Sequence, residues 1–144
     1  SAFDQPLNNW KVDKVTTMQA MFKYAYVFNQ DISMWNMSGV TDISEMLYQA
    51  MKFNQPLNAW DVSDVTNMSG LFSIALAFNQ PLNTWVTSKV SDMSMMFSEA
   101  IAFNQDLSSW DVNLISELPY QFDYKADEWT LPKPVWGTTG APKV

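Results

Sequence analysis

The sequence contains no cysteine, no histidine and no arginine. Without cysteine and histidine, the chain cannot use a thiol nucleophile, a histidine general base or a zinc site built from those ligands. Its eight basic residues are all lysines and stand against 15 acidic residues, which gives a net charge of −7. Because binding to a phosphate backbone needs a basic surface, this charge argues against a nucleic-acid partner.

Long hydrophobic runs are also missing. No apolar run approaches the roughly 18 residues that a membrane-spanning helix needs, so we expect no membrane span. No signal peptide is visible and the first residue is Ser1 rather than methionine, so we expect a processed product or a fragment. The 144 residues are 47% hydrophobic and 15% aromatic, which predicts a single domain with a substantial core.

A repeat with a constant period of 25 residues dominates what is present. Five copies fit between Phe3 and Phe122 without an insertion or a deletion. The clearest columns are a phenylalanine column (Phe3, Phe28, Phe53, Phe78, Phe103) and a tryptophan column (Trp10, Trp35, Trp60, Trp85, Trp110). A fixed period of this length predicts a solenoid, in which each copy forms one coil stacked on the next.

Each copy divides into a strand segment and a helix segment. Residues 57–62 have the spacing L-x-x-W-x-V, which matches the strand of leucine-rich repeats with tryptophan in the second leucine position. Thr66 is a suitable N-cap for a helix. The apolar residues that follow have the spacing of one helix face: Met68, Leu71 or Phe72, and Ala75. We therefore predict an α/β repeat, a right-handed leucine-rich-repeat-like solenoid of five 25-residue coils, with parallel strands on one face and short helices on the other.

Two features leave alternatives open, and the repeat has a clear end. In the fourth copy, Val86 and Thr87 reverse the usual outward polar and inward apolar order, so either Thr87 faces the core or a bulge returns Val86 to it. The repeated glutamines either bond one another along the solenoid or bond their own loop backbone. The pattern stops after Tyr124, which predicts a five-coil solenoid over residues 1–124 and a C-terminal cap with a Pro/Gly-rich tail over residues 125–144.

The aromatic columns are interpreted as core rather than as a strip for stacking on sugars. They occupy inward positions, and stacked rings bury a large apolar area. We expect the core to contain Trp10, Trp35, Trp60, Trp85, Trp110, Phe28, Phe53, Phe78 and Phe103. The acidic residues are scattered over surface columns, and no glycine-rich phosphate loop is present. We therefore expect no catalytic residue, no metal site and no cofactor. The sequons at Asn36 and Asn67 matter only in a eukaryotic secretory pathway.

The outward strand positions are the candidate partner-binding residues. The first outward column is Lys11, Asn36, Asp61, Val86 and Asp111, and the second begins with Asp13, Ser38 and Ser63. The first column varies between copies while the inward columns hardly change. A sheet that offers a different side chain per coil can recognise a protein or a glycan, although solvated positions also vary without any function.

Residues 53–68 read F-N-Q-P-L-N-A-W-D-V-S-D-V-T-N-M, and this unit resembles the BspA-like leucine-rich-repeat family of bacterial surface proteins. The resemblance extends from Phe3 to Phe122. It implies a leucine-rich-repeat solenoid, export to the cell surface, and roles in adhesion or protein binding. It carries no catalytic residues over to this chain.

We therefore expect a non-enzymatic binding and adhesion module of an exported, extracellular cell-surface protein, which recognises a protein or glycan on its sheet face. The alternative is a scaffold or accessory subunit docked on a larger assembly. The chain is expected to be a monomer or part of a longer repeat array. Because the repeat begins at Phe3 with no cap before it, we expect an open edge at the N-terminal end.

Overall fold

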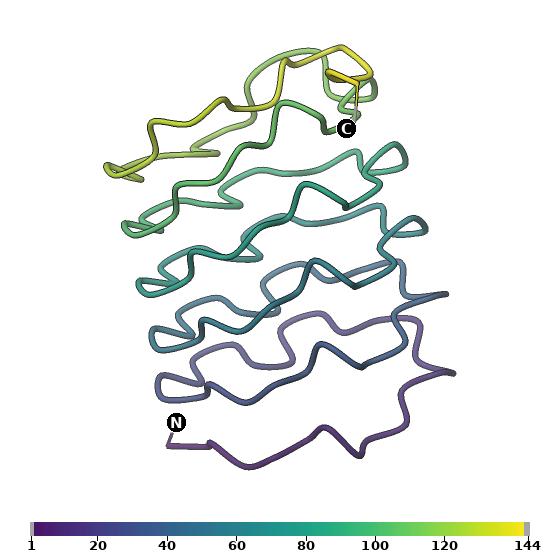
Figure 1. Cartoon of the computed structure of the whole chain (residues 1–144), viewed down its shortest axis with the longest axis vertical. Coiled ribbons are helices and arrows are strands. Elements are labelled where there is room, and N and C mark those ends of the chain that lie inside the picture. Colours follow the sequence, from purple (N-terminus) through teal and green to yellow (C-terminus); the bar gives the residue numbers. More distant parts are fainter. Residues whose placement is uncertain (1, 143–144) are drawn as a thin grey trace.

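The computed structural model of the chain describes residues 2–142. They form a straight stack of repeated coils, with the N-terminus at one end and the C-terminal segment at the other (Figure 1). We name the coils by the phenylalanine that opens each one and use these names below. Coils one to five are residues 3–27, 28–52, 53–77, 78–102 and 103–124, and the C-terminal segment is residues 125–142.

The predicted α/β solenoid is wrong. Residues 2–142 contain no helix and no extended strand, and their only regular pairing is a set of isolated parallel bridges. These bridges join Thr17 to Asp42, Asp42 to Asn67, and Asn67 to Asp92. The predicted face of parallel strands and the predicted row of helices are therefore both absent from the described part of the chain.

Each coil is built from short turns, as coil three shows. Six hydrogen bonds run from a backbone N–H to the carbonyl three residues earlier. The turns they close begin at Leu57, Val62, Met68, Gly70, Phe72 and Ala75. Gly70 and Ile74 are the third residues of two of these turns, and their φ angles are 64° and 57°. A positive φ at this place is the mark of a type II turn, and it interrupts any right-handed helix.

The backbone groups left over by the turns join the coils to one another. Along the segment that was predicted to be helical, alternate N–H groups donate to the next coil, as Phe72 does to the carbonyl of Met96 at 2.9 Å. Direct backbone bonds hold neighbouring chains about 5 Å apart, whereas packed helices need 8–10 Å between their axes. A row of helices therefore cannot fit at this coil spacing.

The threonine column belongs to the same ladder and does not cap helices. The backbone N–H of Thr66 donates to the carbonyl of Thr41 at 2.8 Å, and its hydroxyl donates to the same oxygen at 3.3 Å. Thr41 repeats both bonds toward Thr16. The preference for Thr or Ser in this column follows from that double donation.

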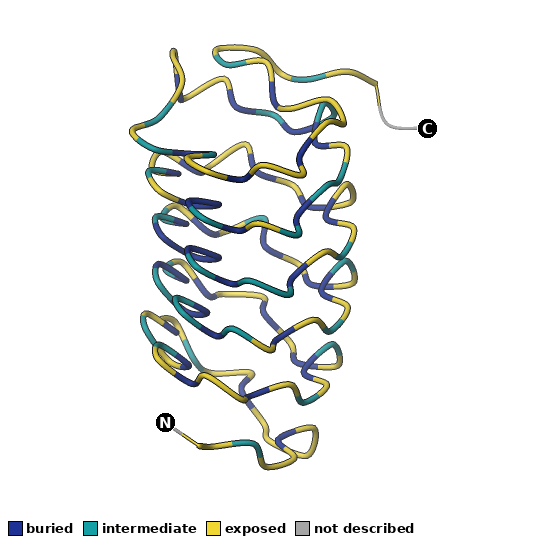
Figure 2. Cartoon of the chain, turned by 90° about the vertical axis from the view of Figure 1, so that its left-hand side faces the viewer, coloured by how far each residue is buried: buried dark blue, intermediate teal, exposed yellow. Residues whose placement is uncertain are grey.

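The core runs along the axis of the stack, and outward-facing positions alternate with it (Figure 2). The phenylalanine rings of successive coils stack with centroids 5.8–6.1 Å apart. Phe28, Phe53, Phe78, Phe103, Trp35, Trp60, Trp85 and Trp110 are buried. Trp10 was expected in the core but is 53% exposed, because no coil covers it on its N-terminal side.

Side-chain amides form a second ladder on the outside of the stack. The Asn29 side-chain oxygen accepts from the backbone N–H of Asn54 at 2.9 Å and from the side chain of Gln55 at 3.2 Å. The same arrangement recurs in the next coils, where Asn54 accepts from Asn79 and Gln80. The glutamines thus bond to the asparagine of the preceding coil, which neither expected alternative described.

Candidate functional site

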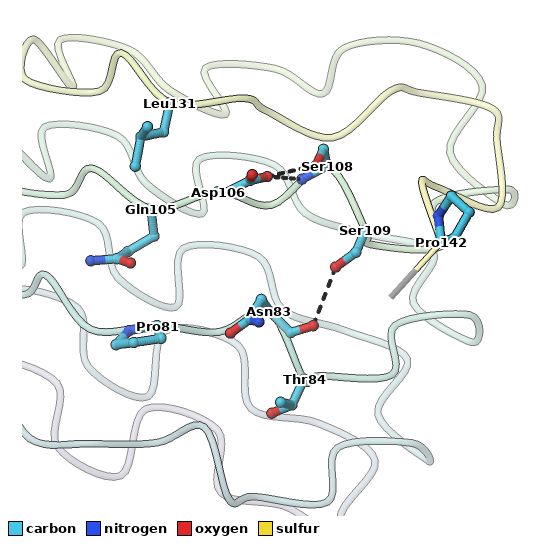
Figure 3. Close-up of a pocket in the computed structure, with 9 residues that line it drawn as sticks. All are labelled: Pro81, Asn83, Thr84, Gln105, Asp106, Ser108, Ser109, Leu131 and Pro142. Atoms are coloured by element: carbon cyan, nitrogen blue, oxygen red, sulfur yellow. Dashed lines mark hydrogen bonds between the residues drawn. The ribbon is translucent and has the colours of Figure 1, made fainter. Parts of the chain in front are cut away.

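Two adjoining hollows form a groove on the surface of coils four and five, beside the C-terminal segment (Figure 3). The first has a volume of about 380 Å³ and the second about 440 Å³. Both are lined by Ser109 and Pro142. The first is completed by Pro81, Asn83, Thr84, Gln105, Asp106, Ser108 and Leu131, and the second by Val86, Thr87, Ser88, Asp111, Thr139, Gly140 and Ala141. We call the two together the groove.

Tight turns place the polar side chains of the groove. The turn that begins at Leu82 carries Asn83 and Thr84, and the turn that begins at Leu107 carries Ser108 and Ser109. The Ser109 hydroxyl donates to the carbonyl of Asn83 at 3.2 Å and so joins the two coils across the floor of the first hollow (Figure 3).

Coil four contributes an exposed apolar side chain because Val86 and Thr87 exchange roles. Thr87 is buried and its hydroxyl donates to the carbonyl of Asp111 at 2.8 Å, which satisfies the buried oxygen. Val86 consequently points outward and is 47% exposed in the groove. The alternative in which Thr87 faces the core is therefore confirmed, and no bulge returns Val86 to the interior.

The C-terminal segment forms one wall of the groove. Leu107 and Val112 donate their N–H groups to the carbonyls of Pro132 and Thr138 at 2.9 Å. The N–H of Ala141 donates to the carbonyl of Ser108 at 2.8 Å. Gly140 lies so close to coil five that a Cβ atom on it would come within 2.5 Å of the Trp110 carbonyl oxygen. The wall is thus fixed to coil five by backbone contacts.

The groove is an acidic surface rich in hydrogen-bond acceptors. Asp106 accepts hydrogen bonds from the hydroxyl and the N–H of Ser108 at 2.6 and 2.9 Å, and these bonds lower the pKa of the Asp106 carboxyl below its ordinary value. Only one oxygen of that carboxylate is used by these bonds. Asp111 adds a second carboxylate, and no lysine lines the groove. Such a surface suits a partner with cationic and hydrogen-bond-donating side chains.

The outward columns lie in Asx turns that hold the coils in shape. The side-chain oxygens of Asn36 and Asp61 accept from the backbone N–H groups of Ser38 and Ser63 at 3.0 Å, and both serine hydroxyls donate to the same atoms. Asp111 accepts from the N–H of Asn113 in the same way. These side chains therefore have a local structural role that the column pattern did not indicate.

Only part of the predicted partner-binding set lines the groove. Val86 and Asp111 do so, whereas the other six predicted residues lie elsewhere: Lys11, Asn36, Asp61, Asp13, Ser38 and Ser63. Sequence reasoning missed Asn83, Thr84, Gln105, Asp106, Ser108 and Ser109. The available signal was the reversed pair Val86 and Thr87, which marked coil four as unlike the others.

The described residues contain no cluster of three or more acidic side chains that could hold a metal ion. Every buried side-chain nitrogen and oxygen between residues 2 and 142 has a hydrogen-bond partner. Between the same bounds, no helix is long and apolar enough to cross a lipid bilayer.

Comparison with known proteins gives one family. The family model described as "Mycoplasma protein of unknown function, DUF285" matches residues 1–72 and again residues 28–136. Two overlapping matches are what a repeated sequence produces, and together they cover most of the chain. No curated protein and no solved structure matches it.

Proposed function

The chain belongs to the DUF285 family, and from this premise we propose that it is a non-enzymatic binding module that recognises a polypeptide partner in the groove. The observation that carries the proposal is the groove itself, a concave surface with two carboxylates and an outward valine on a rigid stack. Display on the cell surface and a role in adhesion are part of the proposal, and the BspA-like resemblance supports them.

The chemistry of the groove favours a polypeptide over a glycan. No aromatic ring lines either hollow, so the flat stacking surface that sugars commonly use is missing there. Val86, Leu131 and the prolines offer apolar contacts, while Asp106 and Asp111 attract lysine or arginine. The net charge of −7 adds long-range attraction for a basic segment.

The test is selection of ligands on the immobilised chain from a phage-displayed peptide library and, in parallel, from a glycan array. We expect enriched peptides that contain lysine or arginine. The variant Ser109→Phe fills both hollows and should abolish their binding. The matched control is Ala59→Phe, which makes the same change at the equivalent position of coil three, outside the groove.

Three outcomes contradict the proposal. The first is no peptide enriched over an unrelated acidic protein. The second is equal binding to Ser109→Phe and to Ala59→Phe. The third is enrichment of glycans alone, which would assign the groove to a sugar instead.

A further inference from the structure

The N-terminal end of the stack exposes side chains that every other coil buries. We define the N-terminal face as the hollow of about 310 Å³ lined by Phe3, Leu7, Trp10, Met21, Phe22, Lys23 and Ala25. Phe3 is 38% exposed, Trp10 53% and Met21 37%. Their counterparts in coils two, three and four are 0–4% exposed, because the preceding coil covers each of them.

The backbone at this face also has unused hydrogen-bonding capacity. In coil two, the carbonyls of Asp42, Ser44, Met46 and Tyr48 accept N–H groups from coil one. The equivalent carbonyls of coil one belong to Thr17, Gln19, Met21 and Lys23, and no donor to them occurs among residues 2–142. The face therefore carries four acceptors, placed on every second residue.

The indole of Trp10 completes the pattern. The indoles of Trp35 and Trp60 each donate to a carbonyl of the preceding coil at 3.0 Å. The indole of Trp10 has no hydrogen-bond partner within residues 2–142. Its ring stacks on Trp35 on one side only, with centroids 6.3 Å apart. A partner that offered a carbonyl and an aromatic ring here would repeat the internal coil contact.

We propose that the N-terminal face docks a coil of the same 25-residue type carried by a partner polypeptide. Such a coil presents N–H groups on alternate residues, as Met68, Gly70, Phe72 and Ile74 do toward coil four. It also presents a carbonyl for the Trp10 indole and rings that stack on Phe3 and Trp10. This inference concerns a second surface and does not depend on the groove.

The polarity of the ladder shows why a second copy of this chain does not fit. Two N-terminal faces brought together would oppose one row of carbonyl acceptors to another, with no donors between them. A head-to-tail contact needs an open C-terminal end, and residues 125–142 cover that end through their bonds to Leu107 and Val112. The occupant is therefore a coil whose donor edge is free.

The first test uses a labelled peptide of residues 53–77 of this chain, added to the full chain and followed by fluorescence anisotropy. We expect saturable binding that weakens about tenfold or more in Trp10→Ser and in Met21→Ser, because each removes an apolar contact at the centre of the face. Met34→Ser is the matched control, since Met34 is 82% exposed outside the N-terminal face. Ser109→Phe should also leave binding unchanged.

A modified peptide tests the donor row separately from the side chains. Methylation of the backbone nitrogens of Phe72 and Ile74 removes two of the four donors that coil three offers. This change should weaken binding, whereas methylation at Ala77, whose N–H has no backbone partner within residues 2–142, should not.

A free peptide must order itself on binding, so a second measurement removes most of that penalty. The same 25 residues are joined to Ser1 through a Gly/Ser linker, which makes docking intramolecular. Hydrogen exchange at Met18, Ala20 and Phe22 should slow in the fusion, and Met21→Ser should reverse the effect. The proposal is overturned if the peptide does not bind and the fusion exchanges like the parent chain. Self-association of the parent chain that Trp10→Ser abolishes would also overturn it, because a second copy would then be the occupant.

Discussion

Each buried tryptophan joins two coils through two different interactions. The Trp60 ring stacks on Trp85 with centroids 6.4 Å apart, and its indole N–H donates to the carbonyl of Ile32 at 3.0 Å. The first interaction buries apolar area, while the second satisfies a carbonyl that lies inside the stack. Phenylalanine can supply only the first, which explains at the residue scale why tryptophan recurs in this column.

Trp60→Phe should therefore destabilise the chain more than the loss of ring area alone. The buried carbonyl of Ile32 loses its donor, and we expect a decrease of about 2–3 kcal/mol in the free energy of unfolding. Trp10→Phe is the matched control, because Trp10 is largely exposed and should cost less than about 0.5 kcal/mol. Chemical denaturation of both variants measures the difference, and equal losses would show that the indole bond has no role.

The outward Asp61 carries a pH dependence that its neighbour in coil two lacks. The hydroxyl and the N–H of Ser63 bond to its carboxylate, and these bonds lower the pKa of Asp61. A carboxyl with a lowered pKa stabilises the fold above its ordinary pKa, and that contribution is lost as the pH falls through the lowered value. Asn36 accepts the same two bonds with a neutral amide.

Asp61→Asn should reproduce the geometry of Asn36 and remove this titration. We expect the wild-type chain to be the more stable of the two at about pH 7, and the difference to shrink or reverse at about pH 2.5. Thermal melts across that range measure it. A constant difference at every pH would contradict the assigned cause, since the other carboxyls titrate in both proteins.

At the scale of elements, the repeat was readable from the sequence and its local structure was not. The 25-residue period and the buried aromatic columns followed from residue identity alone. The helix prediction failed because successive turns also bring Met68, Leu71, Phe72 and Ala75 to the interior, as one face of a helix would. Propensity gave no warning, because Ile74 holds a positive φ that β-branched residues rarely adopt.

The candidate groove was less predictable than the core. Val86 was visible because it broke the pattern of its column, whereas Asn83, Ser108 and Ser109 sit in turns that look alike in every coil. What makes their surroundings different is the C-terminal segment, which lies outside the repeat. Its path back to Ser108 depends on contacts of single residues such as Gly140, and no periodicity encodes them.

Gly140→Ala tests how firmly this wall is fixed. A Cβ there would meet the Trp110 carbonyl oxygen at 2.5 Å and Ser109 backbone atoms at 2.7 Å, so the segment must move away from coil five. We expect faster hydrogen exchange at Val112 and Ala141 and a stability loss of about 2 kcal/mol or more. The control is Gly39→Ala, because Gly39 has a similar φ of 88° but no atom within 4 Å of the added Cβ. Similar losses in the two variants would attribute the effect to backbone strain instead of the close approach.

The whole molecule behaves as a one-dimensional stack, in which each coil contacts only its neighbours. In such a stack the stability of a coil depends on how many interfaces it has. Coil three has two neighbours and coil five has coil four and the C-terminal segment. Coil one has a single interface, so local opening should start there.

Hydrogen exchange can measure this gradient on two chemically matched amides. The N–H of Phe22 donates to the carbonyl of Met46 at 2.9 Å, and the N–H of Phe72 donates to that of Met96 at the same distance. Both residues are phenylalanines in equivalent turns, and both side chains are buried. Any difference in protection therefore reports the position of the coil in the stack.

We expect the Phe22 amide to exchange about tenfold faster or more than the Phe72 amide, because opening coil one breaks one interface whereas opening coil three breaks two. Protection should rise from coil one to coil three and remain high in coil five, whose end the C-terminal segment covers. Mass spectrometry of overlapping peptides, after exchange in native buffer, resolves the coils. Equal protection at Phe22 and Phe72 would show that the stack opens only as a single cooperative unit, in which case an uncovered N-terminal face carries no local weakness.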